Sequence, residues 1–168
     1  MNKFSNESKQ STEIDLFQKT CGGIVDPTLI ILKVHLLTEY YLERIIHIYL
    51  KRGDRAIKDG RLSYQQKLVL VDSLDILDDI FIQCLKGLNK IRNSCAHEIN
   101  KKITMADVEL IARPLGHPCT KFRVKAKNNP IIFLHSVLAF ICGAVSYLVT
   151  HHEQLIISRS NKKKHFLK

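Results

Sequence analysis

The chain of 168 residues contains no tryptophan and little glycine or proline. Seven Gly and four Pro are too few for the closely spaced turns of a sandwich of short strands. Aromatic residues make up 7% of the chain, which argues against a large aromatic platform for stacking bases. Hydrophobic residues at 45% and charged residues at 25% are usual for a folded domain, so wholesale disorder, collagen and disulfide scaffolds are excluded. The length fits one domain.

A signal-peptide pattern and paired cysteines are also missing. The N-terminus, MNKFSNESKQ, is polar and lacks the apolar core of a signal peptide. The five Cys include no CxxC pair, and no zinc-ligand spacing occurs. Cys84, Cys95 and Cys142 lie in apolar helical stretches, where we expect buried small residues of a reducing compartment. We therefore expect a cytoplasmic protein that uses neither a metal nor another cofactor.

Positive charge dominates and is localised. The net charge is +10, and half of this excess lies in residues 113–127, which contain five basic residues and no acidic one. Residues 159–168 contain five more basic residues, again without an acid, so the remainder of the chain is neutral. Two basic stretches on a neutral body indicate a polyanionic partner, either nucleic acid or an anionic membrane surface. A solvated loop and a solubilising tail are the alternatives.

One apolar run is long enough to cross a membrane. Residues 131–149 form 19 positions without a formal charge, and the lysines that follow would then lie on the cytoplasmic side. His135, Ser136 and Ser146 interrupt the run. A central helix that is buried all round in a small bundle has the same pattern. We favour this buried helix, with a tail-anchored membrane protein as the minor alternative.

Helical patterns fill most of the chain. Asp26-Pro27 is a strong helix start, with Asp as the N-cap and Pro in the first turn. Apolar residues then recur every three or four positions, and Gly53 ends this first helix. Ser63 and Gln66 match a capping box that opens the second helix. The patterns predict helices at about 27–52, 63–72, 74–97, 104–112 and 130–157.

The stretch before the last predicted helix contains the strongest breakers. Pro114, Gly116 and Pro118 predict a loop that continues to Pro130. A short strand pair at 121–125 is the alternative, although the alternation of apolar and polar residues there is brief.

The chain as a whole is predicted to be an all-α bundle of four to five helices. We expect a loose lead-in at 1–25, a helical domain at 26–158 and a frayed basic tail at 159–168. Within the first helix, Glu39 and Glu43 lie one turn apart. These two carboxylates could face a binding cleft from the first helix, but we expect them to form salt bridges with Arg44 or Arg92.

The end of the third predicted helix carries the residues with the most chemical potential. At about 100° per residue, Asn89, Arg92, Asn93 and His97 form one polar face with Ala96 at its centre. Such a face can approach a second copy of the same helix, or it can present a cation and an imidazole to a phosphate. Arg92 and His97 point roughly 140° apart, so one straight helix does not aim both at one atom. A buried, paired Asn93 and a capping His97 are the alternatives.

The segment LNKIRNSCAHEI, residues 88–99, resembles the Arg-x4-His signature of HEPN domains. It is most similar to the RN-x-x-AH segment of mannitol-operon-repressor-like and related small HEPN proteins, whose long first helix also resembles that around residues 39–43. The motif spans Arg92 to His97, and the compatible helical layout covers roughly residues 26–157. The resemblance implies a HEPN-like homodimer in which the motifs of two protomers meet at the dimer axis. Many such proteins are metal-independent endoribonucleases that act as toxins or antiviral effectors, and others are non-catalytic regulatory modules.

The resemblance also implies roles for particular residues. His97 would act as the base near the ribose 2′-OH, Arg92 would stabilise the charge that develops on the phosphorus, and Asn93 would orient either His97 or the phosphate. The product would carry a 2′,3′-cyclic phosphate. Asn89 and Ala96 would lie at the dimer interface. The loop expected to hold the RNA backbone contains the bases Arg113, Lys121, Arg123, Lys125 and Lys127.

One position departs from a branch of this superfamily. Toxins that pair with a nucleotidyltransferase antitoxin carry Tyr two residues after the motif histidine, where this chain has Ile99. We therefore do not expect regulation by modification at that position. An antitoxin or regulatory protein of another kind remains a possible partner.

Overall fold

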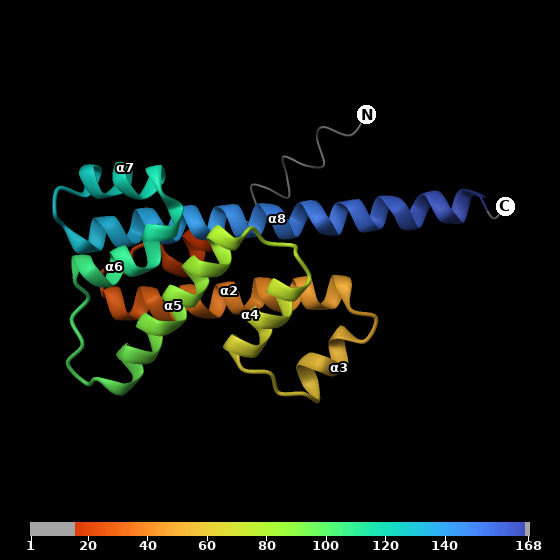
Figure 1. Cartoon of the computed structure of the whole chain (residues 1–168), viewed down its shortest axis with the longest axis horizontal. Coiled ribbons are helices and arrows are strands. Elements are labelled where there is room, and N and C mark those ends of the chain that lie inside the picture. Colours follow the sequence, from red (N-terminus) through yellow and green to blue (C-terminus); the bar gives the residue numbers. More distant parts are fainter. Residues whose placement is uncertain (1–15, 167–168) are drawn as a thin grey trace.

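The computed structural model describes the backbone of residues 16–166 and the side chains as far as Ser158. Within this range the chain is helical and contains no strand, which confirms the all-α class. A helical turn at 16–21 precedes the named elements (Figure 1). These are α2 (Pro27–Tyr49), α3 (Gly53–Lys58), α4 (Tyr64–Ser73), α5 (Asp79–His97), α6 (Met105–Ala112), the 3₁₀ helix η1 (Arg113–Leu115), α7 (His117–Ala126) and α8 (Pro130–Phe166).

Helix α2 is the centre of the bundle. The carboxylate of Asp26 accepts a hydrogen bond from the Thr28 backbone N–H at 2.8 Å, and Pro27 occupies the first turn, as predicted. Ile30, Val34 and Tyr41 repeat along one side of the helix and are fully buried. Helix α2 packs against α8 on one side and against α4 and α5 on another. It therefore ties the polar end of α5 to the hydrophobic core.

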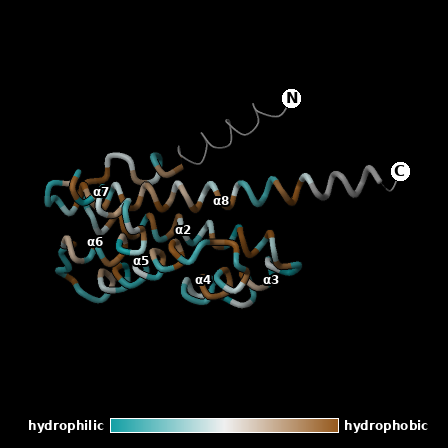
Figure 2. The backbone as a smooth tube through the Cα atoms, turned by 45° about the horizontal axis from the view of Figure 1, so that its top comes forward, coloured by the Kyte–Doolittle hydropathy of each residue, from teal (hydrophilic) through white to brown (hydrophobic). Residues whose placement is uncertain are grey.

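Helix α8 lies along α2 and extends well beyond the bundle (Figure 1). Its inward side chains, including Phe133, Leu138 and Val145, are completely buried against α2, α6 and α7. Where α8 leaves the bundle, a short hydrophilic segment is followed by a short hydrophobic one (Figure 2). Among the described residues, Pro130–Ser158 is the one helix long and apolar enough to cross a membrane; its most apolar stretch of 18 residues has a mean hydropathy of 2.1, and 44% of that stretch is buried. The cellular location stays a prediction.

The loop predicted at 113–129 is wrong, and so is its alternative, the strand pair at 121–125. The structure has η1 and α7 there. Pro114 and Pro118 sit in the first turns of these two helices, where a missing N–H costs no intrahelical hydrogen bond. Gly116, at a φ of 64°, makes the turn between them. The breakers thus separate short helices instead of preventing them.

Three other boundaries also differ from prediction. Helix α2 ends at Tyr49, and Gly53 begins α3 instead of merely ending a helix. Helix α5 begins at Asp79 and not near Leu74, because the chain turns at Asp75, which has a φ of 53°. With α3 and α7 present, four to five helices is an undercount of the described chain.

The two predicted ends of the domain differ as well. Residues 16–21 are helical, and Cys21 is buried in the core, so this part of the lead-in is not loose; residues 1–15 lie outside the described residues. At the other end α8 continues to Phe166, and a frayed tail after Ser158 is wrong for that stretch. Residues 159–166 contain no Gly or Pro that would end the helix.

Candidate functional site

The motif residues occupy the last turns of α5. Ile82, Leu85 and Leu88 turn toward the core, which leaves the polar face predicted from the sequence toward solvent. Asn93, Ala96 and His97 are exposed, and Arg92 and Asn89 are half-buried. The helix ends at His97 because Glu98 adopts an extended backbone conformation.

An open groove of about 460 Å³ follows this face. Asn89, Asn93 and His97 line it together, as the helical geometry predicted. Arg92 does not line it. One wall comes from the first turn of α4, and the lining residues are Gln65, Lys86, Asn89, Lys90, Asn93, Ser94, His97 and Glu98.

Arg92 lies beside the groove, next to Asn93. Its guanidinium donates a hydrogen bond to the side-chain oxygen of Asn93 at 3.2 Å, and its charge contributes to the low pKa of His35 on α2. Among the side chains of residues 16–158, no carboxylate pairs with Arg92. Within one chain Arg92 and His97 therefore lie on different sides of α5, in keeping with their roughly 140° separation.

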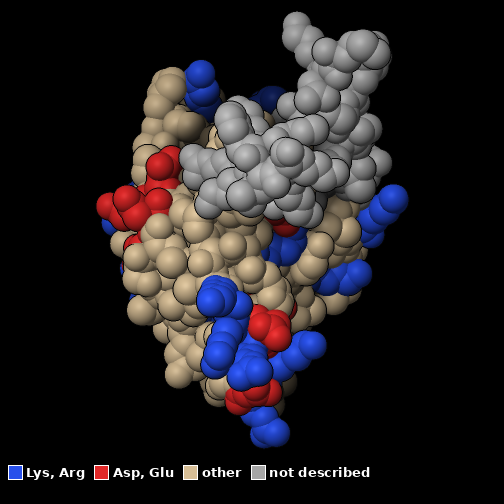
Figure 3. Space-filling view, turned by 90° about the vertical axis from the view of Figure 1, so that its right-hand side faces the viewer, with Lys and Arg blue, Asp and Glu red and all other residues tan. Residues whose placement is uncertain are grey.

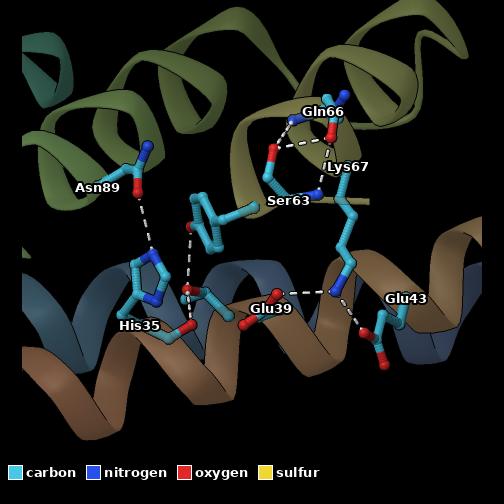
Figure 4. Close-up of polar contacts among 9 residues, drawn as sticks. His35, Glu39, Glu43, Ser63, Gln66, Lys67 and Asn89 are labelled. Carbon is cyan, nitrogen blue, oxygen red and sulfur yellow. Dashed lines mark hydrogen bonds and ion pairs between the residues drawn. The ribbon is translucent and has the colours of Figure 1, made fainter. Parts of the chain in front are cut away.

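Beneath the groove, a buried polar network joins α2, α4 and α5 (Figure 4). The Nε2 atom of His35 lies 3.1 Å from Asn89 Oδ1, and the His35 ring stacks on Tyr64 at 4.0 Å between centroids. The Tyr64 hydroxyl lies 3.0 Å from the Thr38 hydroxyl, which donates to the His35 carbonyl. Burial lowers the pKa of His35, although its hydrogen bond to Asn89 opposes this shift.

This network gives Asn89 a partner within its own chain. In addition to His35, the Asn89 amide reaches Gln65 across the groove at 3.5 Å. Asn89 was predicted at a dimer interface, but its side chain is held by α2 and α4 in the single chain. Ala96, the other residue predicted there, is exposed and makes no such contact.

A second polar cluster fixes α4 to α2. Lys67 Nζ lies 2.7 Å from Glu39 and 2.6 Å from Glu43 (Figure 4). The predicted salt bridges from these glutamates to Arg44 or Arg92 are therefore wrong, since both glutamates pair with Lys67. Arg44 instead forms an ion pair with Glu153 on α8 at 2.7 Å. Lys67 is buried, and its two carboxylate partners overcome the desolvation that would otherwise lower its pKa, so that the pKa is raised.

The basic residues predicted to hold RNA lie elsewhere. All five are exposed on η1, on α7 and just after α7, and Arg123 forms an ion pair with Glu109 at 2.8 Å. Helix α7 packs on α8 and η1, on the opposite side of the bundle from the His97 end of α5 (Figure 1). The structure does not bring Arg113, Lys121, Arg123, Lys125 and Lys127 together with the motif.

The sequence contains a further basic segment, which does not stand out as a run of bases because acidic residues interrupt it. Residues 51–61 surround α3 and contain five bases and two acids. Figure 3 shows Lys and Arg side chains gathered at this end of the molecule, with a few acidic side chains between them. The interspersed Asp54 and Asp59 hid the cluster. Its density of bases was the available signal.

No group of three or more His, Cys, Asp and Glu side chains among the described residues is placed to hold a metal ion. A comparison of the chain with protein-family models, with curated proteins and with solved structures finds no match. The resemblance to HEPN domains therefore stays a prediction from the motif of α5 and the helical layout.

Proposed function

We propose that this chain is a metal-independent endoribonuclease of HEPN type, acting in the cytoplasm as a toxin or defence effector. Its site would combine Arg92 of one protomer with His97 of another. One observation carries the proposal: the last two turns of α5 contain both an exposed His97 and an Arg92 that has no carboxylate partner among the described side chains.

The reaction requires only groups of these types. His97 takes the proton of a ribose 2′-OH, and the 2′-oxygen attacks the adjacent phosphorus. The bond from phosphorus to the 5′-oxygen breaks, and that oxygen takes a proton from water. Arg92 stabilises the negative charge on the phosphoryl oxygens, and Asn93 orients the guanidinium through its hydrogen bond. The products are a 2′,3′-cyclic phosphate and a 5′-hydroxyl.

In a homodimer, Arg92 of one protomer and His97 of the other could face the same site, although the two residues of one protomer point in different directions. An apolar row on α2 supports such an interface. Leu29, Leu36 and Tyr40 are exposed to 41%, 64% and 48%. The row begins beside the end of α5, where Thr28 lies against Cys95. Exposed apolar rows of this kind are typical of protein interfaces.

A non-catalytic regulatory or interaction module is the second candidate. It is favoured by one observation: within a single chain, Arg92 makes its hydrogen bond to Asn93 and does not line the groove with His97. If the two groups never share a site, the face of α5 would serve to bind a partner.

Cleavage of bulk RNA in the presence of EDTA distinguishes the two candidates. The nuclease predicts that the wild type cleaves RNA to cyclic-phosphate ends, that His97→Ala does not, and that His117→Ala, a change of another exposed histidine, retains full activity. Absence of cleavage by a dimeric wild-type protein would contradict the nuclease and favour the module. Light scattering after gel filtration gives the oligomeric state.

A further inference from the structure

Among the side chains that the structure describes outside α7, the segment around α3 is the densest group of exposed cations without acidic partners. The bases are all exposed, and no carboxylate among the described side chains pairs with them. Gly53 holds the segment close to α2, since a Cβ there would lie 2.4 Å from the Ile46 carbonyl oxygen. The cluster is thus fixed to the core helix, and it comprises Lys51, Arg52, Arg55, Lys58 and Arg61.

This α3 cluster leads into the groove of α5. Arg61 is followed closely by Ser63, the N-cap of α4, whose capping box with Gln66 holds the start of that helix. Gln65, in the same first turn, lines the groove. Helix α3, the start of α4 and the end of α5 follow one edge of the molecule in both ribbon views (Figures 1 and 2).

Cations continue on the far wall of the groove. Lys90 is exposed and has no carboxylate partner among the described residues, while Lys86 lies 3.3 Å from Asp72 and is partly neutralised. The exposed His97 and its acidic neighbour Glu98 also line the groove. Positive charge therefore continues from α3, past Gln65, to Lys90 on the wall of the groove that contains His97, and Glu98 is the one acidic residue among the described lining residues.

We propose that single-stranded RNA binds along this edge, with the α3 cluster holding the phosphate backbone and the groove receiving the nucleotide to be cleaved. Cations at intervals along an edge suit a chain of phosphates. The amides of Gln65 and Asn93 offer hydrogen bonds to ribose and bases. Ile57 is the sole large apolar residue of 51–61 and is half-buried, so the segment has little to insert into lipid. The identity of the partner rests on the proposed function.

The test compares two triple variants, each in the His97→Ala background so that RNA is not consumed. One carries Lys51→Gln, Arg55→Gln and Lys58→Gln. The matched control removes the same number of charges from the α7 surface, the one expected from the sequence to hold RNA, through Lys121→Gln, Lys125→Gln and Lys127→Gln. Binding of a fluorescent single-stranded RNA is measured by anisotropy over a range of salt concentrations, and circular dichroism confirms that all variants fold.

We expect the α3 variant to lose at least tenfold in affinity at low salt. Its slope of log K against log salt should become shallower by about 2, since each phosphate contact to a single strand contributes roughly 0.7. The α7 control tests that rival surface, and it should lose clearly less affinity than the α3 variant. Equal or greater loss in the α7 control, or an α3 variant with unchanged affinity, would overturn the proposal.

Failure of this inference differs from failure of the nuclease. A wild type that cleaves RNA while the α3 variant binds normally rejects the α3 surface and leaves the nuclease standing. If the wild type never cleaves RNA while the α3 variant loses RNA binding, the nuclease is rejected and the α3 surface stands. If the protein binds vesicles of phosphatidylserine through α3 and does not bind RNA, the partner proposed here is wrong and a membrane surface takes its place.

Discussion

Replacing Lys67 by Met is the sharpest test of how the bundle holds the groove. The Lys67 side chain is 8% exposed and bridges Glu39 and Glu43, which are 25% and 32% exposed. Met keeps much of the buried stem but removes the ammonium. Two carboxylates one turn apart on α2 then face each other without a cation.

The expected loss follows from these contacts. A hydrogen bond to a charged partner contributes about 1.5–3 kcal/mol, and two such bonds at 2.7 and 2.6 Å disappear. Water still reaches the glutamates, which reduces the penalty to about 2–3 kcal/mol in total. For a chain of this length, that corresponds to a fall in Tm of roughly 4–12 °C.

Urea unfolding followed by far-UV circular dichroism measures the free energy directly. Adding Glu39→Gln and Glu43→Gln to Lys67→Met should recover most of the loss, since no unpaired charge is then left against α4. A Lys67→Met protein within about 0.5 kcal/mol of the wild type would refute the reasoning. So would a triple variant less stable than Lys67→Met alone.

Three further predictions concern the core. Gly87→Ala should lower the free energy of unfolding by about 1–2 kcal/mol, and with it the Tm, because the added Cβ would lie 2.9 Å from the backbone oxygen of Leu110. An unchanged or higher Tm would show that α6 can move aside. Burial, and then the Arg92 charge, lower the pKa of His35, although its hydrogen bond to Asn89 opposes the shift, so the unfolded chain binds a proton at a higher pH than the folded protein does. The free energy of unfolding should be full above about pH 6.5 and fall as the pH decreases toward the pKa of His35 in the folded protein. The same fall in the free energy of unfolding of His35→Gln would contradict this origin. Burial raises the pKa of the Cys142 thiol, so a thiol reagent should modify Cys119 in the native protein and Cys142 only after unfolding. Mass spectrometry of the modified peptides gives the order of labelling, and labelling of Cys142 first would contradict this prediction.

The long helices could be predicted because their signals are local. Asp26 caps α2 and the boxes at Ser63 and Thr104 begin α4 and α6, as their short-range hydrogen bonds require. Helix α7 was missed since Pro118 was interpreted as a breaker, although a proline in a first turn is compatible with a helix. Whether a proline starts or stops a helix depends on the helical register of the residues after it.

The polar face of α5 was predictable for the same local reason, since about 100° per residue fixes which side chains share a side. The surroundings of that face were not. Gln65 reaches Asn89 from another helix, and Lys67 pairs with glutamates of α2, because tertiary packing sets those contacts. The pairing of Arg44 with Glu153 joins residues 109 positions apart, which no local pattern encodes. Local periodicity thus predicts faces, and packing decides their partners.

Mixing two inactive variants tests the composite site most directly. Arg92→Ala and His97→Ala should each fail to cleave RNA. Co-refolded together, half of the dimers are mixed, and each mixed dimer carries one intact site made of Arg92 from one protomer and His97 from the other. Activity should return to roughly a quarter of the wild-type rate. No recovery in a mixture shown to contain mixed dimers, or full activity in either variant alone, would contradict the account.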